Sequence, residues 1–336
     1  MAAGWRGQRP SFICVLGHTD VCLVPGISSA GVSEELRPLT PAADAEVVVL
    51  GRPLCLSDLP SNPTGAPGPS GIARAALRMA GIEARFVGAG LRVWPGVACE
   101  EVPVDASLFE RGVALGREIE APYVVLAESV PGGTTTALAL LLALGYAADG
   151  RVSGSMPGNA HSLKTQVAHE RLRDAGLRVG EGRTDPLGAA RLVGDPMQPL
   201  VAGIACGAAA AGCDVLLAGG SQMVAVAALL VWIAGVASLQ HVAIGTTRWV
   251  VDDPSADVSG LTTEVSPDLP LLAVNLDFSC SRHAALQSYE AYLVKEGVGA
   301  GGACIAALLA TGQTLQALQA EIDQTYDSLL GRLTAQ

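Results

Sequence analysis

The stretch that decides the fold is YVVLAESVPGGTTTALALLLALG, at residues 123–145. It begins with an apolar run typical of a buried strand, which ends at Glu128, and continues through Gly132 and Gly133 into an apolar helix opened by threonines. The amides of such a turn, with the N-terminus of a helix behind them, attract anions such as phosphate. The alternative is an ordinary strand-to-helix turn with a threonine cap. We favour a functional turn, because a carboxylate that ends an apolar strand needs a reason to be there.

Outside this stretch, short runs rich in valine and leucine alternate with helical patterns. Strands are predicted at residues 12–16, 47–50, 123–127, 215–218 and 271–274. Helices are predicted at residues 72–79, 134–144, 163–175, 200–211, 223–237 and 284–293. Strands that alternate with helices indicate βαβ units and an α/β fold with a mostly parallel sheet. Ligands of such sheets bind at the carboxyl ends of the strands, so the loops there should carry the site.

Composition narrows the class of protein. Half of the 336 residues are hydrophobic and 16% are charged, so most elements should be buried on more than one face. The net charge is −11 and no basic cluster is present, which argues against nucleic acid as a partner. The eight cysteines form no CxxC pair and no HExxH is present, so the ordinary zinc spacings are missing. We therefore expect no bound metal, buried thiols and a cytoplasmic location.

Four further segments carry expectations of their own. Residues 1–10 lack the apolar core of a signal peptide and are interpreted as a disordered leader. The Pro- and Gly-rich segment 53–71 is too long for a simple connection, so it is functional or disordered. The apolar run 223–239 falls short of the roughly 20 residues that a bilayer requires and has no basic flank, which favours a buried helix over a membrane span. The amphipathic stripe of 315–333 should cover either the sheet domain or a second subunit.

A second glycine-rich turn, in KEGVGAGG, surrounds Glu296. A single glutamate in a turn is usually solvated, but four glycines at 297, 299, 301 and 302 suggest a carboxylate held where backbone passes close to a ligand. The chain has only two lysines, and both lie in conspicuous places. Lys295 precedes Glu296, and Lys164 lies at the start of a helix, where a compact positive charge suits a phosphate. For Lys295, chance placement on a solvated helix face is the alternative.

The first turn matches neither of two known phosphate-binding motifs. The P-loop requires a lysine in the turn, and none is present between Glu128 and Thr134. Phosphoribosyltransferases that use a diphosphate donor carry two adjacent acidic residues before a similar loop. Here Glu128 is followed by Ser129, so the acidic pair is missing. A mononucleotide donor is still compatible with this turn.

Five segments in the right order resemble the nicotinate-nucleotide:dimethylbenzimidazole phosphoribosyltransferase family of cobalamin assembly, in its archaeal and cyanobacterial branch. They are GHTDVCLVPGISSAG at 17–31, ESVPGGTTTAL at 128–138, GRVSGSMPGNAHSLK at 150–164, DPLGAARLVGDPMQPLVAGIA at 185–205 and NLDFSCSRHAALQSYEAYLVKEGVGAGG at 275–302. The resemblance implies a doubly wound α/β domain, here residues 11–312, and a small helical domain from terminal segments that includes a C-terminal helix at 313–336. It also implies a homodimer.

The resemblance also implies roles for particular residues. Glu296 matches the family's catalytic glutamate, which would take the proton from the attacking base, and Glu128 matches the glutamate of its Gly/Thr loop. Lys164 aligns with the family's phosphate-binding lysine. The residues expected to hold phosphate and substrates are Ser129, Gly132, Gly133, Thr134, Lys164, Gly297 and Gly299.

The implied reaction moves the 5-phosphoribosyl group of nicotinate mononucleotide to a benzimidazole or purine base, and it gives an α-riboside 5′-phosphate and nicotinate. No cofactor is expected, because nicotinate leaves a cationic pyridinium as a neutral ring and no diphosphate requires magnesium. Ser129, Val130, Pro131 and Val298 depart from the bacterial pattern where the acceptor should lie, so dimethylbenzimidazole, adenine and phenolic bases all stay open. The competing hypothesis is a non-catalytic nucleotide-binding protein that has lost its acceptor site.

Overall fold

Seven parallel strands form one sheet in the computed structural model, which describes residues 2–333. The strands are β1 (Ser11–Gly17), β2 (Ala84–Ala89), β3 (Cys99–Glu101), β4 (Tyr123–Ser129), β5 (Asp214–Ala218), β6 (Val242–Thr247) and β7 (Leu271–Val274). Their order in the sheet is β3-β2-β1-β4-β5-β6-β7, and every neighbouring pair is parallel. The chain winds outward from β1 to β3 and then returns to the other side of β1, so β1 and β4 flank the switch point of a doubly wound sheet. The predicted fold class is confirmed.

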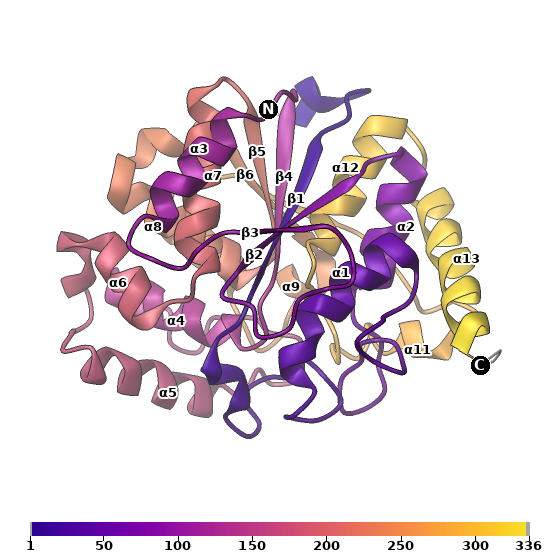
Figure 1. Cartoon of the computed structure of the whole chain (residues 1–336), viewed down its shortest axis with the longest axis horizontal. Helices are drawn as coiled ribbons and strands as arrows, with labels where there is room; N and C mark the ends of the chain where they lie inside the picture. Colours follow the sequence, from indigo (N-terminus) through magenta and orange to yellow (C-terminus); the bar gives the residue numbers. More distant parts are fainter. Residues whose placement is uncertain (1, 334–336) are drawn as a thin grey trace.

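Helices cover both faces of the sheet (Figure 1). One layer contains α3 (Leu108–Arg117), α4 (Gly133–Ala143), α5 (His161–Asp174), α6 (Pro186–Val193), α7 (Met197–Ala210), α8 (Ser221–Ala234) and α10 (Val258–Val265). The other contains α1 (Thr40–Leu50), α2 (Ser70–Ala80), α12 (Ala300–Thr311) and α13 (Leu315–Leu333). Shorter helices are α9 (Arg248–Val251), α11 (Ala284–Gln287), η1 (Ala2–Trp5), η2 (Asp20–Leu23), η3 (Arg37–Leu39), η4 (Glu181–Thr184) and η5 (Val236–Leu239).

The side chains of β4 show why its sequence is apolar without a break. Val124 and Leu126 belong to the buried cluster of the α4–α7–α8 layer, whereas Val125 and Ala127 belong to the cluster under α2 and α12. A strand buried on both faces cannot alternate apolar and polar residues, because neither face meets water. The polar residues therefore begin only at Glu128, near the carboxyl end of the strand.

The strand predicted at residues 47–50 is wrong. These residues form the last turn of α1, which has Pro41 in its first turn and ends at Gly51 in the left-handed conformation (φ 72°). The β-branched run favoured a strand, but these start and stop signals and the buried packing of Val47 and Val48 specify a helix. The helix predicted at 284–293 is also largely wrong, because only α11 forms there. Strands β2, β3 and β6 were not predicted.

The long apolar run lies in α8, which ends at Ala234 where Gly235 adopts a positive φ of 80°. Its first ten residues are buried between α4, α7 and the sheet, in agreement with the prediction of a buried helix. Among the helices of residues 2–333, none is long and apolar enough to cross a membrane.

The expectation of a disordered leader is wrong for residues 2–10, and Met1 lies outside the described residues. Trp5 is 2% exposed and stacks on Tyr123 of β4 with ring centroids 4.5 Å apart. Its indole Nε1 donates to Asp214 Oδ2 at 2.9 Å, and the amide of Gly7 donates to the carbonyl of Leu309 at 2.9 Å. The buried tryptophan with its hydrogen-bonded indole, together with the amide of Gly7, thus anchors this segment.

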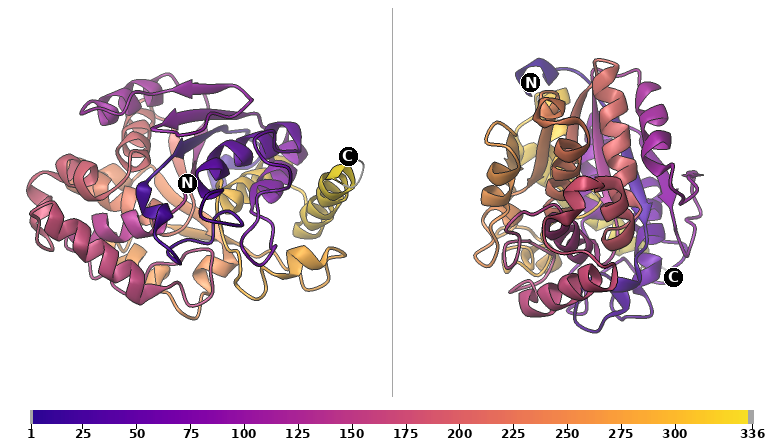
Figure 2. Two further views of the ribbon diagram at one scale, coloured as in Figure 1. Left: turned by 60° about the horizontal axis from the view of Figure 1, so that its bottom comes forward. Right: turned by 90° about the vertical axis from the view of Figure 1, so that its left-hand side faces the viewer.

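The amphipathic stripe of α13 covers the sheet domain, at the periphery of the molecule (Figure 2). Leu318, Ile322 and Tyr326 are buried in the same cluster as α2, so the described part of α13 has no core of its own. Tyr326 fits against Gly71 of α2, where a Cβ would lie 2.7 Å from the phenol ring. Residues 334–336 of the predicted terminal segment lie outside the described residues.

We predict that Trp5→Ala lowers the free energy of unfolding by about 3–5 kcal/mol, the range for loss of a buried aromatic side chain. Denaturant unfolding measures this change. Trp94→Ala, at a tryptophan that is 40% exposed, is the control and should cost much less. A Trp5 variant within about 0.5 kcal/mol of the wild-type protein would contradict the anchoring of the N-terminal segment.

Candidate active site

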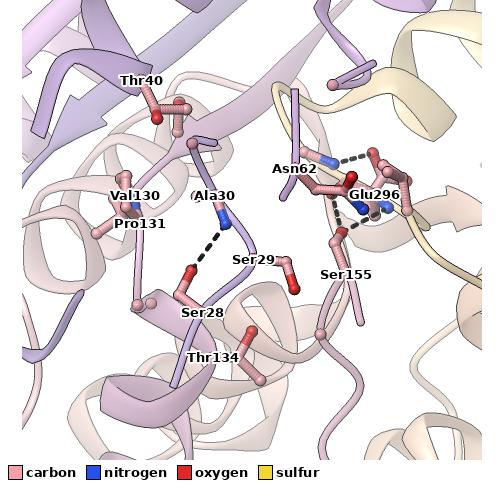
Figure 3. Close-up of a pocket in the computed structure, with 18 of the residues that line it drawn as sticks. Ser28, Ser29, Ala30, Thr40, Asn62, Val130, Pro131, Thr134, Ser155 and Glu296 are labelled. Atoms are coloured by element: carbon pink, nitrogen blue, oxygen red, sulfur yellow. Dashed lines mark hydrogen bonds between the residues drawn. The ribbon is translucent and has the colours of Figure 1, made fainter. Parts of the chain in front are cut away.

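A cavity of about 850 Å³, counted to its open mouth, lies at the carboxyl ends of β1 and β4. It is lined by residues 27–31, 60–62, 68–69, 128–134 and 154–156, by Thr40 and Asp44 of α1, and by Lys164, Gln222, Val294, Glu296 and Gly297. Figure 3 shows Thr134 and Glu296 on different sides of this cavity, with Ser29 between them. Four sequence motifs that lie far apart along the chain thus meet at the switch point, and so does the 53–71 loop.

The turn after β4 is shaped by close packing. Gly132 has φ 83°, and a Cβ there would lie 2.8 Å from the amide nitrogen of Cys22. A Cβ on Gly133, the first residue of α4, would lie 2.2 Å from the side-chain amide of Gln222. Both glycines are therefore required by the fold as well as by any ligand that approaches the backbone. Thr134 follows them at the N-terminus of α4, with its side chain at the cavity.

Lys164 approaches this turn from α5. Residue 154, next to both groups, is a glycine. A Cβ at this position would lie 3.3 Å from the Nζ of Lys164 and 3.2 Å from the hydroxyl oxygen of Thr134. The lysine is 2% exposed, and its Nζ donates to the carbonyl of Asn159. No carboxylate of residues 2–333 forms an ion pair with it. Burial and then the positive charge of Lys295 lower the pKa of Lys164 to about 8. A buried ammonium without a counter-ion is well suited to an anionic ligand.

Lys295 has a different role. Its Nζ lies 2.6 Å from Asp253 Oδ2, and both side chains are 1% exposed. The Nζ also donates to the carbonyl of Met156 and to Asn159 Oδ1, at 3.0 and 3.1 Å. Burial tends to raise the pKa of Asp253, but hydrogen bonds from Asn159, Lys295 and Ser153 lower it to about 2. Lys295 is thus neither on a solvated face nor free for a phosphate, and it ties the 156–159 segment to the Glu296 turn.

The carboxylate of Glu296 is held by the N-terminus of α12. Its Oε1 accepts from the amides of Gly297 and Gly301 at 3.0 and 3.2 Å, and its Oε2 accepts from Gly301 and from the hydroxyl of Thr246 at 3.2 and 3.3 Å. Burial nevertheless raises the pKa of Glu296 to about 7, against the lowering effect of these donors. The group is therefore fixed in position and has a proton affinity suited to a base near neutral pH.

The Glu296 turn is fastened to the end of β4. The amide of Val298 donates to the carbonyl of Glu128 at 2.9 Å, and Val298 adopts a left-handed φ of 54°, which is rare for a β-branched residue. Gly299 has φ 63°, and a Cβ there would lie 2.5 Å from the Cβ of Ala127. A Cβ on Gly297 would lie 2.9 Å from the ring of Pro69. The turn needs its glycines because three elements converge on it.

Glu128 is 7% exposed, and its Oε2 accepts from the amide of Val130 at 2.9 Å. Burial raises the pKa of Glu128 to about 8, and the negative charge of Asp195 adds to this effect. The negative charges of Glu296 and then Asp44 act on the pKa in the same direction. The two predicted glutamates therefore interact electrostatically across one site.

Several residues at the cavity were not predicted individually. Asp44 accepts from the hydroxyl of Ser129 at 2.8 Å, so Ser129 orients a carboxylate there. Ser155 donates to the carbonyl of Glu296 at 2.9 Å and positions its turn. The available signal for Asp44 was a carboxylate among the apolar residues of 41–50, but only residues 47–50 of this run were assigned a structure, and that assignment was a strand. Within residues 2–333, no group of three or more His, Cys, Asp or Glu side chains could hold a metal ion.

We predict that Lys295→Met lowers the free energy of unfolding by about 3–5 kcal/mol, because it leaves the buried charge of Asp253 without its partner. Denaturant unfolding of this variant and of the double variant Lys295→Met, Asp253→Leu measures the coupling. The double variant should regain part of the loss, since it removes both charges. A single variant as stable as the wild-type protein would show that the pair does not support the fold.

Comparison with known proteins gives close relatives and a distant structural neighbour. No family model matches the chain. A UPF0284 protein of Gloeobacter violaceus is 44% identical over 345 residues, which cover 96% of this chain and 89% of that protein. A UPF0284 protein of Sulfolobus acidocaldarius is 39% identical over 337 residues, 95% of either chain.

The solved structure of nicotinate-nucleotide-dimethylbenzimidazole phosphoribosyltransferase from Thermus thermophilus is similar with a TM-score of 0.57 and 20% identity, over 93% of this chain and 85% of that one. This likeness confirms the fold that the resemblance implied. The sequence identities over nearly the full length of the cyanobacterial and archaeal relatives decide the family: the chain belongs to the UPF0284 family.

Proposed function

We propose that this protein transfers the 5-phosphoribosyl group of nicotinate mononucleotide to a ring nitrogen of an aromatic base, giving an α-riboside 5′-phosphate and nicotinate. The observation that carries the proposal is one cavity at the switch point that combines an unpaired buried lysine with two glutamates of raised pKa. The activity for which the structural neighbour is named supports the choice of donor and acceptor.

The donor's phosphate fits the end of the cavity near α4. Lys164 supplies a positive charge, Thr134 a hydroxyl, and the first turn of α4 its free amides. The absence of a side chain on Gly154 leaves space between the lysine and the threonine. The ribose and its pyridinium ring then extend toward Glu128 and Glu296, and the negative charge of ionised Glu296 favours a cationic ring.

In the reaction, the lone pair of the acceptor nitrogen forms a bond to C1′ of the ribose, and the bond from C1′ to the pyridinium nitrogen breaks. Nicotinate leaves with that electron pair as a neutral ring. Attack from the opposite face inverts C1′, and Glu296 accepts the proton that the acceptor base loses. Positive charge develops on the ribose as the bond to nicotinate weakens, and a fixed carboxylate stabilises that charge without reorganising.

The competing candidate is a protein that binds the nucleotide without catalysis. Its pocket would need the lysine but neither glutamate, whereas Glu296 is held here by hydrogen bonds from two amides and a hydroxyl. Incubation with nicotinate mononucleotide and a panel of bases, with mass detection of riboside phosphates, separates the two functions. Binding of the nucleotide without release of nicotinate for any base would refute transfer. Sedimentation would test the homodimer, which stays a prediction.

We predict a bell-shaped dependence of kcat/KM on pH. Glu296 must be ionised to accept a proton, so activity falls as the pH drops through about 7, and Lys164 must be protonated to hold phosphate, so activity falls as the pH rises through about 8. Glu296→Gln should lower kcat by roughly 10²–10⁴-fold and remove the acidic limb. Glu110→Gln, at an exposed position of α3, is the control. A kcat of Glu296→Gln within threefold of the wild-type value would contradict the assignment of Glu296 as the general base.

We predict that Lys164→Ala acts mainly on KM for the donor, because its charge binds the phosphate equally in substrate and transition state. A charge-assisted hydrogen bond is worth about 1.5–3 kcal/mol, so donor affinity should weaken by roughly 10- to 150-fold. Lys164→Arg should recover only part of it, since the planar guanidinium presents its donors differently. Calorimetric titration with nicotinate mononucleotide measures this. Unchanged affinity in Lys164→Ala would remove the lysine from the site.

A further inference from the structure

Helix α1 presents two unsatisfied polar atoms to the cavity. Thr40 and Asp44 are four residues apart, so they lie on the same face of the helix, and both line the cavity. Thr40 Oγ1 and Asp44 Oδ1 are buried, and neither has a hydrogen-bond partner within residues 2–333. Asp44 is 4% exposed. Buried polar atoms in folded proteins are nearly always paired, so two such atoms on one helix face indicate a missing partner.

The surroundings of Asp44 define what that partner must offer. Its Oδ2 accepts from the hydroxyl of Ser129 at 2.8 Å, which fixes the carboxyl, whereas Oδ1 has no such partner. Burial raises the pKa of Asp44 to about 7, against the hydroxyls of Ser129 and Ser70, which lower it. An N–H donor suits the ionised group, whereas a second carboxylate would be repelled. Thr40 can donate to a ring nitrogen or accept from an N–H.

The position of this pair points to the acceptor and not to the donor. Figure 3 shows Thr40 at the other end of the cavity from Thr134, which belongs to the phosphate end of the proposed site. The nicotinate ring carries a carboxylate, and burying it against Asp44 would bring two like charges together. A neutral base that carries an amino group beside a ring nitrogen meets both unsatisfied atoms.

We propose that Asp44 and Thr40 form the recognition edge for the acceptor base and select an amino-substituted heteroaromatic base, such as an aminopurine, over the same ring without its amino group. Asp44 Oδ1 accepts from the amino group, and the Thr40 hydroxyl donates to the adjacent ring nitrogen. This inference rests on the proposed transferase function, and it names the class of acceptor. The two residues are specificity determinants, and they take no part in the bond-making step.

Adenine and purine are matched probes, because they differ only in the amino group. Calorimetry and steady-state kinetics with nicotinate mononucleotide would compare both bases on the wild-type protein and on Asp44→Leu, Thr40→Val and Thr40→Ser. Thr263→Val, at an exposed helical threonine outside the cavity, is the control. The readout is the ratio of the two bases on each variant, which a general loss of stability does not change.

The wild-type protein should prefer adenine over purine by roughly 10- to 100-fold, as for one hydrogen bond to a charged group. Asp44→Leu should remove the preference, Thr40→Val should weaken adenine binding by roughly 2- to 10-fold, and Thr40→Ser should retain it. Donor affinity should stay unchanged. If Asp44→Leu does not fold, the comparison of Thr40→Val with Thr40→Ser decides.

Two failures are distinguishable. Equal use of adenine and purine by the wild-type protein, transfer to 5,6-dimethylbenzimidazole in preference to adenine, or a preference that survives in Asp44→Leu would overturn the recognition edge while transfer itself stands. If adenine binds selectively through Asp44 but no base yields a riboside phosphate, the recognition edge is supported and the transferase function falls.

Discussion

The hydrogen bond from the amide of Val298 to the carbonyl of Glu128 is the contact on which the site depends. It joins the end of β4 to the turn before α12, and Gly299 lets that turn approach Ala127 so closely that a Cβ has no space. A left-handed valine is costly, so the surrounding structure must compensate for it. As a result of this turn, the N-terminus of α12 holds the carboxylate of Glu296 in the same site as Glu128. The contact thus joins the Glu296 turn to the end of β4, which carries Glu128.

Burial shifts every titratable group at the cavity toward its neutral form. The pKa values of Asp44, Glu128 and Glu296 rise above their usual range, and that of Lys164 falls. Burial disfavours the charged forms of these side chains, and a ligand that brings opposite charges to them makes those forms favourable. A nucleotide with a phosphate at one end and a cationic ring at the other compensates both ends at once. Neither a simple phosphate nor a neutral base does so, which is the physical reason to favour a pyridinium nucleotide as donor.

The sequence predicts strands β1, β4, β5 and β7 and the two glycine-rich turns because local signals agree there, whereas three strands of the sheet were not predicted. In β4 and α4, an apolar run, a carboxylate and paired glycines all indicate one strand, one turn and one helix. Local signals conflict in 40–50, where a valine run favours a strand and the proline and glycine at its ends favour a helix. Trp5 and Lys295 show a second limit, because their roles follow from Tyr123 and Asp253, partners that no local pattern identifies.

The polar groups around the cavity are of two kinds, those with a hydrogen-bond partner in the protein and those without one. The sequence motifs do not distinguish the two kinds, whereas the structure does. The side chains of Glu296, Ser155 and Asn62 form hydrogen bonds with backbone groups of the protein. Their positions in the cavity wall are therefore fixed before a ligand binds. Asp44 Oδ1, Thr40 Oγ1 and Gln222 Oε1 have none among the described residues. Satisfied groups give a site its shape, whereas unsatisfied buried groups carry an energetic penalty that a ligand can relieve. The proposed selectivity for the acceptor base therefore resides in the second kind, and on α1 these atoms lie just before residues 47–50, for which the sequence pattern predicted a strand.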